Sequence, residues 1–408
     1  MPAHDLLQAA IAHETEALHD SLVAIRRDIH AHPEVSHAEF RTTEKIVEIL
    51  GRAGLKAEVL SVGTGALCDI VPDGYDCSDG LIGFRADIDA LPIPDGKSVS
   101  FASTNPGVCH ACGHDVHTTI VLGLGLVLAR LRNRGLMTRG VRLIFQPAEE
   151  TSPSGALDAI DSGALKGVIE AYALHCDPRT DVGQVGLKSG PITSALDGVH
   201  VSLTGPGGHT SRPHLTADIV GALGALATSA PLLLSRRVDP RGGASLIWGR
   251  IDAGTTGNAI PRAGDIYGTL RALRLDVWHA AQKLVPELFA QIVAPYGVSI
   301  AVDVTPGVPP TVNHPGGVQR LTEAAVDFVG PDAVTATEQS LGGEDFSWML
   351  QQVPGAMGRL GVRTPGVSGF PDIHQSTFAV DERCIQVGVR LLTGLAVAGA
   401  PIADGFFE

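Results

Sequence analysis

The spacing of apolar residues changes from helical to strand-like within the first half of the chain. Leucine and isoleucine at positions 18, 22, 25 and 29 fall on one face of a predicted helix that ends at His32-Pro33. A second helix is predicted over residues 40–53, and a long apolar helix over residues 115–131. Short apolar runs predict strands at residues 81–84, 141–145 and 168–174. Strands that alternate with helices are typical of an α/β fold with a largely parallel sheet covered on both faces.

The middle of the chain follows a different order of elements. Strands are predicted at residues 199–203, 244–251, 265–271 and 298–304, and helices at residues 217–234 and 276–296. This βαββαβ order is typical of a ferredoxin-like layer. We therefore expect one mixed-sheet domain formed by residues 1–190 and 307–408, with a second domain of residues 191–306 inserted into it.

Composition narrows the classes of protein. The 408 residues carry 30 Lys and Arg against 44 Asp and Glu, a net charge of −14, which disfavours binding to nucleic acid or to anionic membranes. The longest uninterrupted apolar run, residues 120–129, is shorter than the ~18–20 residues of a membrane span. The N-terminus lacks the pattern of a signal peptide, and the six cysteines are sparse. These features predict a cytoplasmic protein with reduced thiols.

Candidate chemistry gathers where predicted strands end. Three strands are followed directly by acidic residues or histidine, namely Asp87 and Asp89, Glu149 and Glu150, and His175. A string rich in cysteine and histidine, residues 109–117, precedes and opens the long apolar helix. Because ligands bind at the carboxyl edge of such sheets, we expect these side chains to converge. Thiolate, imidazole and carboxylate together are typical ligands of a divalent transition metal.

Each of these features also has a simpler interpretation. Glu149 and Glu150 could form a solvated turn, His175 could be a buried histidine with satisfied hydrogen bonds, and the aspartates could cap the next segment. Cys109 and Cys112 form a Cys-x-x-Cys string ahead of a helix, where the dipole favours thiolate, so a thiol redox module is an alternative. The chain has no second Cys-x-x-Cys string that would complete a four-cysteine zinc site.

Four strings carry a family resemblance: residues 26–34 (RRDIHAHPE), 85–92 (RADIDALP), 110–115 (HACGHD) and 145–150 (FQPAEE). They resemble the metal-dependent amidohydrolases of the aminoacylase/carboxypeptidase clan, in the branch of hippurate hydrolases, N-acyl-amino-acid amidohydrolases and auxin-conjugate hydrolases. Further similar strings lie at residues 207–209, 257–261, 268–271 and 343–347, so the resemblance covers almost the whole chain.

The resemblance implies a catalytic domain that binds two divalent ions (Zn, Mn, Ni or Co) and an inserted lid or dimerisation domain. The implied metal ligands are Cys112, His114, Glu150, His175 and His374, and Asp89 orients one of them. Glu149 takes the place of the general base. In the lid, His209 is expected to reach an active site, often that of a partner subunit, and Asn258 and Arg271 to bind the substrate carboxylate.

The implied reaction is hydrolysis of N-acyl amino acids to a carboxylic acid and an amino acid, by a homodimer that pairs through the lid. A dipeptidase using the same site and a non-catalytic binding protein are alternatives. The chain departs from the family pattern at Cys109, where methionine is usual, and in residues 370–376 around His374. Because of the second departure, the structure has to show whether His374 reaches the other implied ligands.

Overall fold

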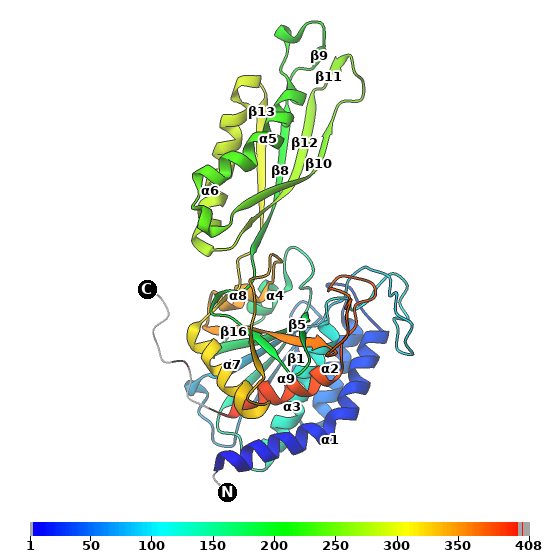
Figure 1. Ribbon diagram of the computed structural model, residues 1–408, viewed down its shortest axis with the longest axis vertical. Coiled ribbons are helices and arrows are strands. Elements are labelled where there is room, and N and C mark those ends of the chain that lie inside the picture. The colour runs from blue at the N-terminus through cyan, green and yellow to red at the C-terminus, as the bar shows by residue number, and fades with distance from the viewer. Residues whose placement is uncertain (1–2, 399–401, 403–408) are drawn as a thin grey trace. The chain divides into compact units, whose positions relative to one another are not determined.

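The computed structural model describes residues 3–398 and 402, which form two compact units (Figure 1). The first unit contains the described parts of residues 1–190, 312–338 and 345–408. The second contains residues 191–311 and 339–344. The chain crosses between the units within β7 (Gly190–Pro191), just before β14 (Val312–Asn313), and again at residues 338–339 and 344–345. The catalytic and lid roles expected for the two parts remain predictions.

The first unit is built on an eight-stranded mixed sheet. In order across the sheet, the strands are β1 (Ala57–Val59), β2 (Ala66–Ile70), β4 (Gly140–Gln146), β3 (Leu81–Asp87), β5 (Val168–Asp181), β16 (Gly355–Arg363), β6 (Val185–Leu187) and β15 (Val334–Ala336). The central strands β4, β3, β5 and β16 run parallel, whereas β1, β2 and β6 add antiparallel pairs. The predicted mixed, largely parallel sheet is therefore confirmed.

Helices cover both faces of this sheet. They are α1 (Ala3–Ala31), α2 (Phe40–Arg52), α3 (His114–Asn133), α4 (Gly155–Asp161), α7 (Pro315–Phe328), α8 (Phe346–Leu350) and α9 (Arg383–Val397), with a short 3₁₀ turn, η1 (Cys77–Asp79). Phe84 and Ala86 of β3 point into the hydrophobic core beneath α3. Arg85, on the opposite face of β3, donates to Asp345 at the start of α8. Alternating residues of one strand thus serve a dry core and a polar face.

Strand β5 is longer than its sequence pattern predicts. The apolar run ends at Leu174, but β5 continues to Asp181, so His175 lies within the strand and not after it. The extension is paired along β16, with His175 opposite Arg359 and Asp181 opposite Arg363. The extension has no apolar pattern because it pairs with a glycine-containing part of β16, where a Cβ at Gly361 would lie 2.0 Å from the carbonyl oxygen of Asp181. Close backbone contact replaces the apolar pattern here.

The second unit has the predicted βαββαβ order. Its elements are β8 (Ala195–Thr204), α5 (Ile219–Arg237), β10 (Ser245–Ala253), β12 (Ala263–Ala272), α6 (Leu275–Val293) and β13 (Ser299–Val308). The antiparallel sheet has the order β10-β12-β8-β13, and its apolar face packs under α5 and α6. A small two-stranded ribbon joins β9 (Gly208–His209) to β11 (Ala259–Ile260), and 3₁₀ turns lie at η2 (Pro213–Leu215), η3 (Pro240–Gly242) and η4 (Ala294–Tyr296).

Helix α5 is the one described helix that is long and apolar enough, by length and composition alone, to cross a membrane. Its sequence is interrupted by Thr228, Ser229 and Pro231, so a search for uninterrupted apolar runs does not detect it. One side of α5, including Ala222 and Leu226, is buried in the core of the second unit. Burial of this side accounts for much of its apolar character.

Candidate metal centre and active site

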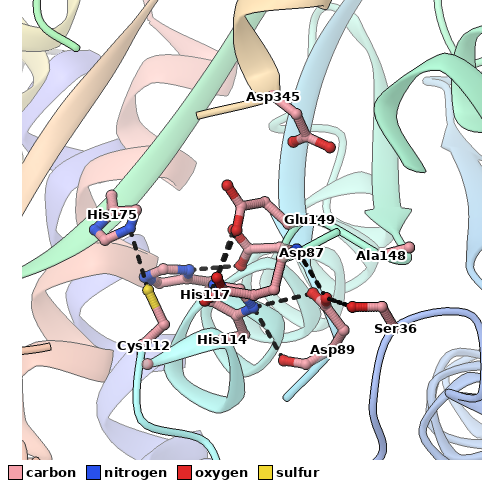
Figure 2. A network of polar contacts seen from close by, with 12 residues as sticks. Ser36, Asp87, Asp89, Cys112, His114, His117, Ala148, Glu149, His175 and Asp345 are labelled. Carbon is pink, nitrogen blue, oxygen red and sulfur yellow. Dashed lines mark hydrogen bonds and ion pairs between the residues drawn. The ribbon is translucent and has the colours of Figure 1, made fainter. Parts of the chain in front are cut away.

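In the first unit, side chains from several strand ends meet at one edge of the sheet (Figure 2). Asp87 ends β3, and Asp89 follows it; Cys112 lies in the loop before α3, and His114 is the first residue of α3. Glu149 and Glu150 follow β4, and His175 lies on β5. Parallel strands bring these segments together because their carboxyl ends share an edge.

His114 presents one ring nitrogen to the centre of this cluster. Its Nδ1 lies 3.0 Å from the carbonyl oxygen of Asp89 and 3.1 Å from Asp89 Oδ1, so Nδ1 carries the proton. Its Nε2 is buried, makes no hydrogen bond within the described residues, and lies 3.9 Å from carboxylate oxygens of both Glu149 and Glu150. Because Nδ1 donates to Asp89, the lone pair of the neutral ring is on Nε2. This arrangement, with a carboxylate on the other ring nitrogen, is typical of a metal-ligating histidine.

Cys112 and His175 supply two further donors. His175 Nδ1 donates to the carbonyl oxygen of Cys176 at 2.8 Å, which turns His175 Nε2 towards Cys112 Sγ at 3.6 Å. Donor atoms of Cys112, His114 and Glu150 all lie within 4.8 Å of one another. Sulfur, nitrogen and oxygen donors at this spacing fit Zn, Mn, Ni or Co.

The unusual loop before His374 still brings this residue to the cluster. The backbone N–H of His374 donates to the carbonyl oxygen of Ala111 at 2.7 Å, and its Nε2 lies 3.2 Å from Glu150 Oε1. His374 holds a left-handed backbone, φ 64°. The hydrogen bond with Glu150 raises the pKa of His374. All five predicted metal ligands therefore lie within one cluster of the first unit.

Electrostatics favour binding of a cation here. Burial raises the pKa of the Cys112 thiol well above its usual range, so a bound cation is needed to stabilise the thiolate. Burial and then the charge of Arg359 lower the pKa of His175 well below its usual range, which keeps its lone pair available. Burial opposes charge on Asp87, but Arg85 outweighs it and holds the pKa of Asp87 well below its usual range.

A second acid–histidine group lies directly beneath the cluster. Asp87 accepts a hydrogen bond from His117 Nδ1 at 2.6 Å, and His117 Nε2 accepts the N–H of Cys176 at 2.9 Å. Because both ring nitrogens of His117 have protein partners, His117 serves as a support and not as a ligand. Sequence reasoning did not assign a role to His117 or to Asp345. Asp345 lies in a string of the family resemblance, residues 343–347, and His117 lies two positions after another, residues 110–115, but their contacts depend on the fold.

Arg85 connects the Asp87–His117 group to Asp345, which lies in the C-terminal part of the chain. It donates to Asp87 Oδ2 at 2.7 Å and to Asp345 Oδ1 at 2.6 Å, and Gln146 Nε2 donates to Asp345 Oδ2 at 2.6 Å. All four side chains are buried. The network joins β3, β4 and the start of α8, and an oxygen of Asp345 lies within 4.8 Å of an oxygen of Glu149 (Figure 2).

In the second unit, His209 and Asn258 lie together on the ribbon of β9 and β11. His209 pairs with Ala259, and Thr210 donates to the carbonyl oxygen of Asn258. His209 Nδ1 accepts the backbone N–H of Ser211 at 3.1 Å, so the proton of a neutral ring is on Nε2. The exposed side chain of His209 is therefore prepared to donate a hydrogen bond through Nε2.

Arg271 lies at the opposite end of the second unit's sheet. It pairs with Leu196, whereas Ala263, next to the ribbon, pairs with Thr204. Eight residues of extended strand separate these pairs, which corresponds to roughly 27 Å. The guanidinium of Arg271 donates to the carbonyl oxygen of Leu341 at 2.6 Å. The structure thus places Arg271 apart from His209 and Asn258 within one copy of this unit.

Cys109 lies in a small apolar cluster and not in a reactive environment. Its side chain is 0% exposed and packs with Leu91, Ala111 and Cys112. Burial raises the pKa of Cys109. The expectation that a helix dipole favours thiolate in this Cys-x-x-Cys string is therefore wrong, because desolvation dominates.

Comparisons with known proteins agree with this geometry. Residues 83–398 match the family described as "Peptidase family M20/M25/M40". A Rhodococcus jostii protein named "Putative glutamate--cysteine ligase 2-3" is 45% identical over 93% of the chain, but the chain spans only 47% of that relative. A Bacillus subtilis "N-acetyl-L-cysteine deacetylase" is 34% identical over 90% of this chain and 85% of its own length.

A solved structure is similar to almost the whole chain. The YxeP protein of Bacillus subtilis, described as a dinuclear metal-binding peptidase from the M20 family, superposes with a TM-score of 0.81 at 30% identity. The alignment covers 94% of this chain and 98% of that protein. The chain therefore belongs to peptidase family M20/M25/M40, a family of metal-dependent hydrolases of amide bonds, and its described residues contain groups of side chains that could hold a metal ion.

Proposed function

We propose that the enzyme hydrolyses N-acyl amino acids and releases a carboxylic acid and an amino acid. The observation that carries this proposal is the position of Glu149, whose Oε2 lies 3.9 Å from the ligating nitrogen of His114. A carboxylate beside, but distinct from, the donor set suits a general base for amide hydrolysis. The similarity to a protein named for deacetylation of N-acetyl-L-cysteine makes N-acyl-cysteine the first substrate to test.

In the proposed mechanism, each residue has a separate task. Cys112, His114, Glu150, His175 and His374 would hold two divalent metal ions, which would supply Lewis acidity and lower the pKa of the attacking water. Glu149 takes the proton of the attacking water and delivers it to the leaving amine. His209 donates its Nε2–H to the developing oxyanion. Asp89 keeps His114 in the correct tautomer through its contacts with Nδ1.

Recognition of the substrate carboxylate falls to Asn258 and Arg271 in this proposal. A guanidinium binds a carboxylate bidentately, which suits Arg271. An N-acyl amino acid is about as long as an extended dipeptide, roughly 7 Å. Since roughly 27 Å of strand separate Arg271 from the ribbon of His209 and Asn258, one substrate molecule does not reach both within one copy of the second unit.

This separation supports a homodimer in which the ribbon of one subunit serves the active site of the other. The second unit has surfaces that suit pairing. Its edge strand β10 exposes Ile247 (63%) and Ile251 (48%), and α5 exposes Val220 (54%) and Leu232 (58%). An edge strand beside an uncharged helix face is a surface that a second copy can cover. The homodimer is part of the proposal.

The proposed compartment is the cytoplasm. Five cysteines of the described residues are free and buried, namely Cys68, Cys109, Cys112, Cys176 and Cys384. A metal ligand such as Cys112 must stay reduced to bind its ion, which a reducing compartment ensures.

The test is a substrate panel with defined metal loading. The enzyme is stripped, reloaded separately with Zn, Mn, Ni or Co, and assayed on N-acetyl-L-cysteine, other N-acetyl- and N-benzoyl-amino acids, and dipeptides. Glu149→Gln, prepared in parallel, controls for contaminating hydrolases. We expect the highest kcat/KM on an N-acyl amino acid. Cleavage of dipeptides alone would assign a dipeptidase, and no cleavage of any amide would refute the proposal.

A further inference from the structure

The turn that carries Glu149 and Glu150 begins with a strained residue. Ala148 holds a left-handed backbone, φ 54°, although it has a Cβ. Such a conformation costs about 1–3 kcal/mol and persists only where its surroundings enforce it. Ala148 directly precedes Glu149, so its backbone dihedral angles set the direction in which the carboxylate of Glu149 points (Figure 2).

Glu39 makes one of the contacts that hold this turn. Its Oε1 accepts the backbone N–H of Ala148 at 2.8 Å and the backbone N–H of His37 at 3.0 Å. On the other side of the turn, the N–H of Gly155 donates to the carbonyl oxygen of Ala148 at 2.9 Å. The backbone N–H and the backbone C=O of Ala148 therefore both have hydrogen-bond partners. Of these two partners, Glu39 is the one that uses its side chain.

The segment before α2 also contacts the other acid of the site. Ser36 donates to Asp89 Oδ2 at 2.6 Å, and the backbone N–H of Ala90 donates to the carbonyl oxygen of Glu34 at 2.8 Å. Asp89 Oδ2 in turn accepts the N–H of Glu150 at 3.0 Å. Residues 34–39 therefore connect the end of β3 with the turn after β4.

From these contacts, we propose that Glu39 is a positioning residue for Glu149: by accepting the N–H of Ala148, its carboxyl keeps the strained turn in the orientation that aims Glu149 at the metal centre. The inference rests on the proposed function, in which Glu149 is the general base. Glu39 touches neither substrate nor metal in this proposal and acts only through the turn.

Burying a carboxyl group costs free energy, so an apolar side chain would suit this position better if the residue only filled space. Glu39 is 0% exposed, and its Oε2 makes no hydrogen bond within the described part of the chain. Burial raises the pKa of Glu39, so a neutral carboxamide fits the same surroundings. Glu39→Gln keeps the accepting oxygen, whereas Glu39→Met keeps similar volume without it. The two variants separate the hydrogen bond from the packing.

The experiment is a double-mutant cycle with Glu149 in the metal-loaded enzyme. We expect Glu39→Met to lower kcat about 10- to 100-fold per metal-loaded site, the effect of a misaligned catalytic group. KM and the metal content should stay within about twofold of the wild-type values. Glu39→Gln should keep kcat within about threefold. In a Glu149→Gln background, measured at high enzyme concentration, Glu39→Met should change the residual rate less than about twofold.

An equal fold-loss from Glu39→Met in both backgrounds would overturn the inference, because it would show action independent of Glu149. If Glu39→Met does not fold, Glu39→Asp replaces it; this substitution withdraws the acceptor by about one bond length, ~1.5 Å. Unchanged kcat in Glu39→Asp would equally overturn the inference. Failure of the proposed function looks different: Glu149→Gln itself would then leave amide hydrolysis unaffected.

Discussion

His175 Nε2 lies 3.6 Å from Cys112 Sγ, although 63 residues separate the two in the chain. Cys112 belongs to the loop before α3, and His175 is fixed within β5 by its pairing with β16. Burial and the charge of Arg359 lower the pKa of His175 well below its usual range. A ligand that is already unprotonated loses no proton when it binds a metal, so His175 favours metal binding at neutral pH.

The adjacent carboxylates Glu149 and Glu150 should be separable by mutation. We expect Glu149→Gln to keep its metal and to lose about 10²–10⁴ in kcat, the effect of removing a general acid–base group. Glu150→Gln should lose metal, because Glu150 lies within 4.8 Å of the Cys112 and His114 donors. Metal content measured beside single-turnover rates decides between the roles. Equal metal loss in both variants would contradict the assignment.

Subunit mixing tests whether His209 acts across a dimer. Inactive His209→Ala protomers mixed with inactive Glu149→Gln protomers should regain activity, because one active site of each mixed dimer then contains both intact residues. If all dimers mix randomly, about a quarter of the wild-type activity is expected per total subunit. Subunit exchange is verified with two distinguishable tags. An exchanged mixture that stays inactive would assign His209 to the active site of its own chain.

The side chains that the structure brings together at the candidate metal centre could be predicted from sequence because local strings carry them. Cys112 and His114 lie two positions apart at the start of a helix, and Glu150 directly follows an apolar strand. The buried polar contacts around these side chains could not be predicted in this way. Arg85 and Asp345 form an ion pair at 2.6 Å across 260 residues, and no local pattern specifies such a contact.

The elements of the fold likewise divide into those that a local pattern predicts and those that depend on contacts distant in sequence. The βαββαβ order of the second unit follows from its regular alternation of apolar positions. Strand β16 was not predicted, because Gly355, Gly358 and Gly361 interrupt its pattern while allowing the backbones to approach closely. Residues 339–344 group with the second unit because of tertiary contacts with the inserted segment, such as those of Leu341 with Ser194 and Arg271, which lie far away in sequence.

A buried ion pair should make a large contribution to stability when only one partner is removed. Arg320 Nη1 lies 2.8 Å from Glu170 Oε1, and Glu170 also accepts from Tyr172 Oη at 2.6 Å. Arg320→Met should lower the free energy of unfolding by about 3–5 kcal/mol, because it leaves Glu170 buried without its cation. The Arg320→Met/Glu170→Gln double variant should lose less, and urea unfolding measures both. A larger loss in the double variant would refute this explanation.

The junction of α1 and α2 gives a pH-dependent prediction. Asp28 on α1 contacts Arg41 Nη2 at 3.0 Å and Lys45 Nζ at 2.6 Å on α2. Burial alone would raise the pKa of Asp28, but the hydrogen bonds from Lys45 and Arg41 outweigh it and lower the pKa below the ordinary 3.8. Near and below the ordinary value, the unfolded chain therefore binds more protons than the folded chain, and the stabilisation by Asp28 falls as the pH falls.

The comparison of wild type with Asp28→Asn isolates this contribution. Above about pH 5, the wild type should be more stable by about 0.5–1 kcal/mol, the range of a partly exposed ion pair. The difference should shrink as the pH falls through the folded-state pKa of Asp28, where both chains carry a neutral group at this position. Urea unfolding of metal-loaded protein between pH 3 and 8 measures it, and 1 M salt should reduce the difference at neutral pH. A difference that grows on acidification would show that Asp28 does not stabilise the junction through its charge.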